Sequence, residues 1–210
     1  NCGNVLDETY LRSSLNNFEK NKFKELLKNR YPQFDVMFQE ASEETNIEKN
    51  LLAAISFQES QWDPRAKSNM GVRGMMMVTL ETAAMVGVEK RLNPDQNIKG
   101  GAKYFAILQE KNKIGPTQAD KLSITLASYN LGPTNILNIA NQINKDIEQV
   151  TWTQIQNKLK TMKGSELNLT DQVSYTRAQQ AIDYVDRVKD YYRLLSAHSC
   201  TPPKDQLTFF

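Results

Sequence analysis

Apolar residues recur at helical spacing along most of the chain, and no alternating pattern is long enough for a β-sheet. Between residues 34 and 41 they follow i, i+3, i+4 and i+7, which predicts a short amphipathic helix. The preceding region, from about residue 7 to 29, is also expected to be helical until Tyr31–Pro32 breaks it. The pattern therefore predicts a mainly α fold class.

The next predicted helix begins near Asn46 and contains a long apolar run, Leu51–Phe57. Asp63–Pro64 is expected to stop this helix, which leaves Glu59 in its last turn. Residues 65–78 carry two glycines and few helix signals, so they are expected to form a loop or a small β excursion.

Helices continue to the end of the chain. Thr79 is expected to cap a short helix that ends at Gly87, and Asn93–Pro94 to start another. Gly100–Gly101 is a poor helix-forming pair, which predicts close backbone packing there. Further helices are predicted over about 118–130, from Pro133, around Trp152–Leu159 and over about 170–197, before an extended tail.

Composition restricts the function classes. A chain of 210 residues, 40% hydrophobic and 24% charged, is ordinary for one well-cored soluble domain, possibly with a small appendage. A net charge of +2 and the lack of a basic stripe argue against nucleic acid as a partner. No apolar stretch is long enough to span a bilayer, and no signal peptide is visible. Because the chain begins with Asn1, we expect a processed or excised piece.

Two cysteines and one histidine offer little for metal or nucleophilic chemistry. Cys2, Cys200 and His198 cannot form a four-ligand metal site, and we expect no cofactor. His198 is expected to be an exposed residue of a polar tail. In an oxidising compartment Cys2 and Cys200 could pair and join the termini; the alternative is that both are free.

Glu59 is the candidate for acid–base chemistry. With apolar residues behind it, its pKa is expected to rise, so that it can hold a proton near neutral pH. A general acid that protonates a glycosidic oxygen needs this property. Taken alone, such a residue is more often a solvated helix end. Asp63 lies close by, but before Pro64 it is expected to form a turn, so a second catalytic carboxylate is missing.

The residues around Glu59 form a longer motif. Residues 59–76 read Glu-Ser-x-aromatic-Asp-Pro-x-Ala-x-Ser-x-x-Gly-x-x-Gly-x-Met, and residues 127–132 read Ala-x-Tyr-Asn-x-Gly. Together they resemble the two motifs of the lytic transglycosylases related to Slt and to goose-type lysozyme. Met77 stands where most of that family has Gln, which resembles the membrane-bound lytic transglycosylase F branch.

The resemblance implies a lysozyme-like helical domain over residues 34–197, with a connecting segment over 1–33 and an extended tail over 198–210. It implies cleavage of the bond between N-acetylmuramic acid and N-acetylglucosamine in peptidoglycan. A single Glu first protonates the bond and then accepts a proton from the muramic C6 hydroxyl, which attacks C1 and gives a 1,6-anhydro end. The 2-acetamido group of the substrate takes the place of the missing enzyme nucleophile, and no cofactor is needed.

The same resemblance assigns the surrounding residues. Ser60 is expected to orient or stabilise the ionised Glu59 by a hydrogen bond. The remaining expected substrate contacts are Ser68, Met76, Met77, Tyr129, Asn130 and Tyr184.

Two other functions stay open. A goose-lysozyme-like hydrolase would need a positioned water and usually another acidic residue. A cell-wall-binding domain that has lost its activity is the second, and Met77 leaves it open. The implied partner is the peptidoglycan glycan strand, with a regulatory domain like a solute-binding protein outside this chain. The implied location is the periplasm, with the full-length protein associated with the outer membrane.

Overall fold

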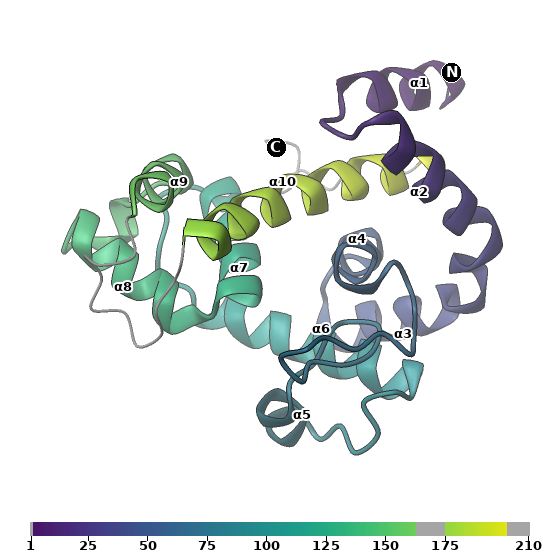
Figure 1. Cartoon of the computed structure of the whole chain (residues 1–210), viewed down its shortest axis with the longest axis horizontal. Helices are drawn as coiled ribbons and strands as arrows, with labels where there is room; N and C mark the ends of the chain where they lie inside the picture. Colours follow the sequence, from purple (N-terminus) through teal and green to yellow (C-terminus); the bar gives the residue numbers. More distant parts are fainter. Residues whose placement is uncertain (1, 163–174, 201–210) are drawn as a thin grey trace. The chain divides into compact units, whose positions relative to one another are not determined.

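The computed structural model describes residues 2–162 and 175–200, which form ten α-helices, two 3-10 helices and isolated β-bridges (Figure 1). None of the described helices is both long and apolar enough to span a bilayer. The helices are α1 (Cys2–Arg12), α2 (Asn17–Asn29), α3 (Asp35–Thr45), α4 (Lys49–Ser60), α5 (Leu80–Val86), α6 (Pro94–Lys111), α7 (Gln118–Leu131), α8 (Pro133–Ile143), α9 (Trp152–Thr161) and α10 (Tyr175–His198); the 3-10 helices are η1 (Tyr31–Gln33) and η2 (Ile147–Gln149).

The chain folds into two compact units. The first holds the residues up to Ala106 together with α10 from Arg187 onward. The second holds the described residues between Ile107 and Asp186. The division therefore falls inside α6 and inside α10.

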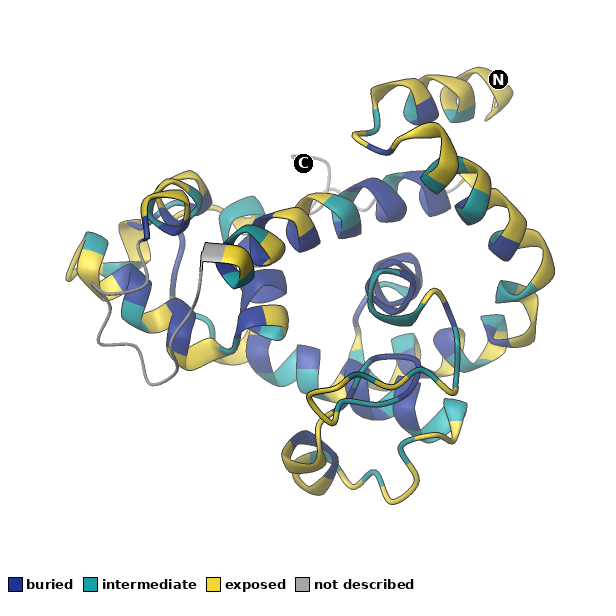
Figure 2. Cartoon of the chain, viewed as in Figure 1, coloured by how far each residue is buried: buried dark blue, intermediate teal, exposed yellow. Residues whose placement is uncertain are grey.

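Helix α4 forms the centre of the first unit and packs against α3. Its residues from Leu51 to Phe57 are all buried, so the apolar run of the sequence becomes core (Figure 2). Trp62, just beyond the helix, is also fully buried and its indole N–H donates to the Ala53 carbonyl at 2.9 Å. The ring of Trp62 contacts those of Phe57 and Tyr31, with centroids 4.7 and 4.8 Å away. These contacts hold the first residues after α4 against the core of the first unit.

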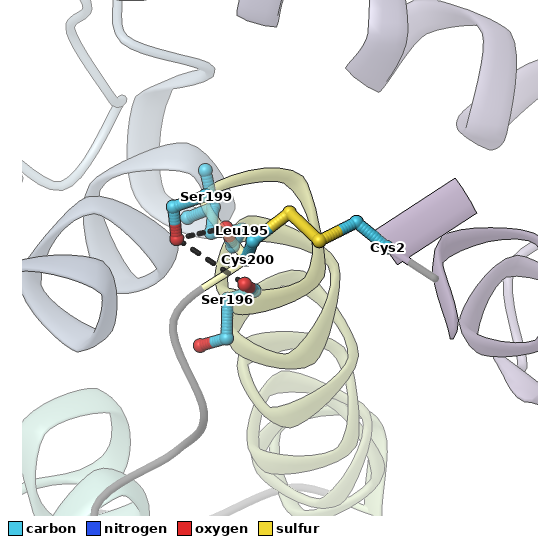
Figure 3. Close-up of a disulfide and its surroundings, with 5 residues drawn as sticks. All are labelled: Cys2, Leu195, Ser196, Ser199 and Cys200. Atoms are coloured by element: carbon cyan, nitrogen blue, oxygen red, sulfur yellow. Dashed lines mark hydrogen bonds between the residues drawn. A yellow bond between two sulfur atoms is a disulfide. The ribbon is translucent and has the colours of Figure 1, made fainter. Parts of the chain in front are cut away.

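The two ends of the described chain meet in the first unit. A disulfide joins Cys2 to Cys200, whose Cα atoms lie 5.9 Å apart (Figure 3). The Tyr10 hydroxyl lies 2.8 Å from His198 Nε2. The expectation that His198 belongs to a tail was wrong, because it ends α10 and its ring packs edge-on against Tyr10, although the residue is exposed as expected.

The second unit is built on α7, α8 and α9, which contact one another pairwise. Thr117 and Thr151 cap the N-termini of α7 and α9 through their side-chain oxygens. The Asp120 carboxylate accepts a hydrogen bond from the Trp152 backbone N–H at 2.8 Å, which links the starts of these two helices. Fully buried isoleucines such as Ile139 form the core between them.

Most predicted helices are confirmed, and the exceptions have local causes. The predicted helix over 7–29 is two helices, because Asn16 starts α2 with a capping box to Glu19. The motif helix ends at Ser60, before the Asp63–Pro64 stop that we expected. The tail beyond Cys200 and the predicted start of the last helix, at residues 170–174, lie outside the described residues.

Candidate active site

Glu59 is the second-last residue of α4 and is half-buried. The helix ends immediately afterwards because Gln61 adopts a left-handed conformation with φ 51°. The Gln61 N–H closes the last turn on the Phe57 carbonyl at 2.8 Å. Glu59 therefore lies in the last turn of a buried helix, as predicted from the sequence.

The segment that follows, residues 61–79, is here called the motif loop. Two serines of α4 hold it: the hydroxyls of Ser56 and Ser60 each lie 2.8 Å from the Met75 carbonyl, to which they donate. Ser60 also lies 3.1 Å from the Ser56 carbonyl. The expected hydrogen bond from Ser60 to Glu59 is replaced by these bonds to the backbone, because Ser60 has a single hydroxyl proton to donate.

Asn97, a fully buried residue of α6, connects the loop to the rest of the unit. Its amide nitrogen donates to the carbonyls of Arg73 and Arg91, at 2.9 and 2.7 Å. Its amide oxygen accepts from the Met76 N–H at 2.7 Å. Three backbone groups that are distant in sequence are therefore satisfied by one side chain.

Close packing needs glycine at three positions. Gly74 has φ +82°, and a Cβ there would lie 2.3 Å from the Arg91 carbonyl oxygen. A Cβ on Gly101 would lie 2.4 Å from Met76 Cβ, and one on Gly100 would lie 2.2 Å from a methyl of Val88. The prediction that Gly100–Gly101 permits close packing is confirmed.

The predicted β excursion is also confirmed in the motif loop. Arg73 forms isolated antiparallel bridges with Lys67 and with Val78. The Arg91 guanidinium donates to the Gly71 carbonyl at 2.6 Å and to the Val78 carbonyl at 3.0 Å. A cation beyond the loop therefore binds two of its carbonyls.

Asp63 has the turn role expected from the sequence. Its carboxylate accepts a hydrogen bond from the Arg65 N–H at 2.9 Å, which is an Asx-turn.

Burial distinguishes the expected substrate contacts in the loop. Ser68 and Met77 are half-buried, and Met77 has a left-handed φ of 49°. Met76 is fully buried and packs beside Gly101, so its side chain has no surface with which to touch a sugar. Met76 therefore has a packing role and is not a substrate contact.

The other expected contacts belong to the second unit. Tyr129 is half-buried and Asn130 exposed, in the last turn of α7. Gly132, with φ 96°, closes that turn by a 2.9 Å hydrogen bond from its N–H to the Ser128 carbonyl. Tyr184 is buried in α10.

The electrostatics beneath the motif loop favour a neutral Tyr31. Burial, and then the nearby Asp35 carboxylate, raise the pKa of Tyr31 well above its usual range. Burial alone would raise the pKa of Asp35, but hydrogen bonds from Lys49 and Tyr31 outweigh it and lower the pKa. No group of three or more His, Cys, Asp or Glu within residues 2–162 and 175–200 is placed to hold a metal ion.

Sequence reasoning missed the residues that position the loop: Ser56, Arg91 and Asn97. Ser56 carried a usable signal, because it is the one hydroxyl within the apolar run of α4. Asn97 carried a weaker one, because it is a polar residue next to the apolar Ile98. Arg91 lies in a polar segment with no periodic pattern and could not be singled out.

Comparison with known families agrees with the two motifs. The sequence profile of the Transglycosylase SLT domain matches residues 36–152. This range is more than half of the chain and includes both the motif loop and the end of α7.

Two relatives are similar over most of this chain. Membrane-bound lytic murein transglycosylase F 1 of Alkalilimnicola ehrlichii is 38% identical over 169 residues, which are 79% of this chain and 34% of that protein. Membrane-bound lytic murein transglycosylase F of Photobacterium profundum is 33% identical over 201 residues, 92% of this chain and 39% of that protein. The chain thus spans somewhat more than a third of the length of these relatives.

Two solved structures share the fold. The 70 kDa soluble lytic transglycosylase of Escherichia coli matches with a TM-score of 0.53 and 20% identity, covering 80% of this chain and 25% of that one. Lytic transglycosylase Slt of Pseudomonas aeruginosa matches with a TM-score of 0.52 and 18% identity, covering 80% and 24%. These likenesses confirm the mainly helical, lysozyme-like fold class.

Proposed function

This chain belongs to the SLT transglycosylase family, and on that premise we propose that it is the catalytic part of a peptidoglycan lytic transglycosylase. Glu59 is the one catalytic carboxylate. The observation that carries the proposal is the position of Glu59, half-buried near the end of a helix in which every residue from Asn50 to Phe57 is buried. A buried helix fixes the place of the carboxyl group at its end, which general acid–base catalysis requires.

The reaction needs two proton transfers, one from Glu59 and one back to it. The Glu59 carboxylic acid protonates the glycosidic oxygen as the bond from C1 of N-acetylmuramic acid breaks. The 2-acetamido group of the same sugar stabilises C1. The C6 hydroxyl then attacks C1, and the Glu59 carboxylate takes its proton. A 1,6-anhydro end and a free N-acetylglucosamine end result, no water is consumed, and the acid is regenerated.

The neighbouring residues support this chemistry in different ways. Ser60 acts indirectly, since its hydroxyl donates to the Met75 carbonyl and so fixes the motif loop beside the end of α4. Ser68 and Met77 are the candidate sugar contacts of the loop. Tyr129 and Asn130 are assigned to the same reaction by the family motif they match, and Tyr184 is assigned by its place in the final helix.

The cellular setting follows from the relatives. Both are named membrane-bound lytic murein transglycosylases, so the proposed location is the periplasm, with attachment to the outer membrane through another part of the protein. Residues 34–197 are the proposed catalytic domain. A regulatory domain like a solute-binding protein is proposed in the part of the protein outside this chain.

Digestion of purified peptidoglycan, followed by mass spectrometry, tests the proposal. We expect products lighter by one water molecule than hydrolytic muropeptides. Glu59→Gln should lower their rate of formation about 10³-fold or more, since both proton transfers depend on this group. Glu43→Gln, which makes the same change at an exposed position of α3, is the matched control and should leave the rate unaltered.

Two outcomes would replace the proposal. Products that contain the added water, and that disappear in Glu59→Gln, would show a goose-lysozyme-like hydrolase. Binding of peptidoglycan without products from the unaltered chain would show a wall-binding domain.

A further inference from the structure

The chain reverses directly after Glu59 with an unusual backbone. Gln61 and Trp62 both adopt left-handed conformations, with φ 51° and 57°, and neither is a glycine. A residue that carries a Cβ pays a cost in free energy for this conformation, so it persists only where its surroundings hold it. Residues held in this way collect at functional sites. The contacts that hold Gln61 and Trp62 therefore affect the position of Glu59, which lies two residues before Gln61.

The carbonyl of Gln61 is held from outside α4. The Gln61 N–H closes the last turn of the helix, whereas its carbonyl oxygen accepts a hydrogen bond from the Arg30 guanidinium at 3.0 Å. Cationic side chains bind the last carbonyls of a helix well, because these groups form the negative end of the helix dipole. Arg30 itself follows the last turn of α2, where its N–H donates to the Leu26 carbonyl at 2.9 Å.

The residue after Arg30 strengthens this contact. The ring of Tyr31 packs on that of Trp62, with centroids 4.8 Å apart. The hydroxyl of Tyr31 is hydrogen-bonded to the Asp35 carboxylate, which also accepts from Lys49, the first residue of α4, at 2.9 Å. The backbone around Arg30 is therefore fixed both to the reversal after α4 and to the start of the same helix.

Arg30 lies outside the part of the chain that the family comparison covers. The matched residues begin at 36, and the sequence led us to expect only a connecting segment over 1–33. Neither family motif includes Arg30. The structure nevertheless gives this segment a direct contact with the end of the helix that carries Glu59.

We propose that Arg30 is a positioning residue for the reaction of Glu59. Its guanidinium holds the Gln61 carbonyl, and with it the left-handed reversal, so that the last turn of α4 keeps one geometry. Arg30 acts through this backbone and does not touch the glycan. A proton donor must stay within hydrogen-bond reach of the glycosidic oxygen, so loss of the geometry slows the chemical step more than it weakens glycan binding. This inference rests on the proposed function for the role of Glu59.

The kinetic test compares Arg30→Met with Lys28→Met. The first keeps an unbranched stem and removes the donors; the second removes a charge at an exposed position in the last turn of α2. Rates of anhydro-product formation are measured at increasing concentrations of soluble peptidoglycan fragments. We expect the kcat of Arg30→Met to fall about tenfold, with KM altered less than about twofold. Arg30→Lys, which keeps a cationic donor, should recover most of the loss, and Lys28→Met should leave both constants unaltered.

A second measurement needs no activity and uses the two tryptophans of the chain. In NMR spectra of Arg30→Met, the indole N–H signal of Trp62 should shift, because its bond to the Ala53 carbonyl belongs to the reversal. The signal of Trp152, in the second unit, should not move. A dispersed amide spectrum with an unmoved Trp152 signal shows that the variant is folded.

Four kinetic results would overturn the inference: an unchanged kcat in Arg30→Met, an equal fall in Lys28→Met, no recovery in Arg30→Lys, or a higher KM with kcat unaltered. An unmoved Trp62 signal in Arg30→Met would overturn it as well. Anhydro products formed with normal kinetics by Arg30→Met would remove this inference alone. If the unaltered chain forms no anhydro products, the proposed function fails, and the Trp62 signal still decides whether Arg30 holds the reversal.

Discussion

Two helix ends in this chain carry the two family motifs, and they are built differently. Helix α7 ends at Leu131 and the chain enters α8 at Pro133, so Gly132 alone makes the joint. Helix α4 ends at Ser60 and is followed by the motif loop, which pairs its own backbone in turns and isolated β-bridges, such as the hydrogen bonds between Arg73 and Val78 at 3.1 and 2.9 Å. The α7 joint is closed by its own backbone alone. The motif loop is held in addition by side chains that lie outside it.

The difference shows where each structure is encoded. A glycine with φ 96° followed by Pro at the first helical position is a local signal that can be recognised in the sequence. The motif loop depends on Ser56 of α4, on Arg91, and on Asn97 of α6. Its geometry should therefore respond to mutations far from it in sequence, whereas the α7 joint should not.

Removing the amide of Asn97 should give the largest effect. Asn97→Leu keeps the number and branching of the side-chain heavy atoms but removes the acceptor of the buried Met76 N–H bond and the donor of the part-buried bond to the Arg91 carbonyl. We expect a loss of about 3–5 kcal/mol in the free energy of unfolding, measured by urea denaturation.

The matched variant in the second unit is Asn135→Leu. Asn135 is also buried, but it donates one hydrogen bond, to the Leu131 carbonyl, and its Oδ1 has no hydrogen-bond partner among the described residues. We expect a loss of about 1 kcal/mol or less. Equal losses for the two variants would contradict the contrast between the loop and the joint.

A methyl group at Gly101 should give the next largest effect. Its Cβ would lie 2.4 Å from that of Met76, so the loop or α6 must move. After allowing for the better helix propensity of Ala, we expect Gly101→Ala to destabilise by about 2 kcal/mol in thermal unfolding. Gly87→Ala, at a positive φ with nothing within 4 Å of the added Cβ, should cost about 1 kcal/mol from backbone strain alone. A smaller loss at Gly101 than at Gly87 would show that the contact with Met76 is loose.

The Asx-turn of Asp63 is the local element within the motif loop, and its loss should matter less. Asp63→Ala removes one hydrogen bond, to the exposed Arg65 N–H. We expect about 0.5–1 kcal/mol of destabilisation, seen as a small fall in the urea midpoint. Asp63→Asn keeps an acceptor oxygen and should restore most of it. A loss as large as that of Asn97→Leu would mean that the loop is encoded locally after all.

The smallest effect is expected at His198, the last residue of α10. Although His198 as a whole is exposed, partial burial of its ring beside Tyr10, with a contribution from the charge of Lys24, lowers its pKa in the folded protein. The unfolded chain therefore binds this proton more readily, so the contribution of the neutral ring is complete above about pH 6.5 and is lost as pH falls through the lowered pKa. Between about pH 7 and pH 5, the urea midpoint should fall more for the unaltered chain than for His198→Gln. Equal falls would show that the ring has no part in the pH dependence.

Sequence reasoning predicted the fold wherever the deciding signals were local. Thr79 and Gly87 bound α5 as expected, and Gly132 with Pro133 separates α7 from α8. The position of Glu59 followed from the apolar run before it. The break before α2 was missed because its signal, a capping box at Asn16, lies in a polar stretch that has no Pro or Gly to mark a helix end.

The interior of the candidate site could be predicted only in part. The hydroxyl of Ser60 donates a hydrogen bond to a backbone carbonyl, and no sequence motif indicates where a carbonyl will lie. The role of Asn97 depends on the approach of α6 to the motif loop, a contact between segments about 20 residues apart. The burial of Met76 follows from the same approach, because Gly101 makes room for it.

The claim that one carboxylate performs both proton transfers is tested most directly by comparing Glu59→Gln with Asp63→Asn. Each variant digests peptidoglycan in water enriched in the heavy oxygen isotope, and the products are weighed by mass spectrometry. The account predicts anhydro products without heavy oxygen from the unaltered chain and from Asp63→Asn, and almost none from Glu59→Gln. Heavy oxygen in the products, together with an equal loss of activity in Asp63→Asn, would show a two-carboxylate hydrolase and contradict it.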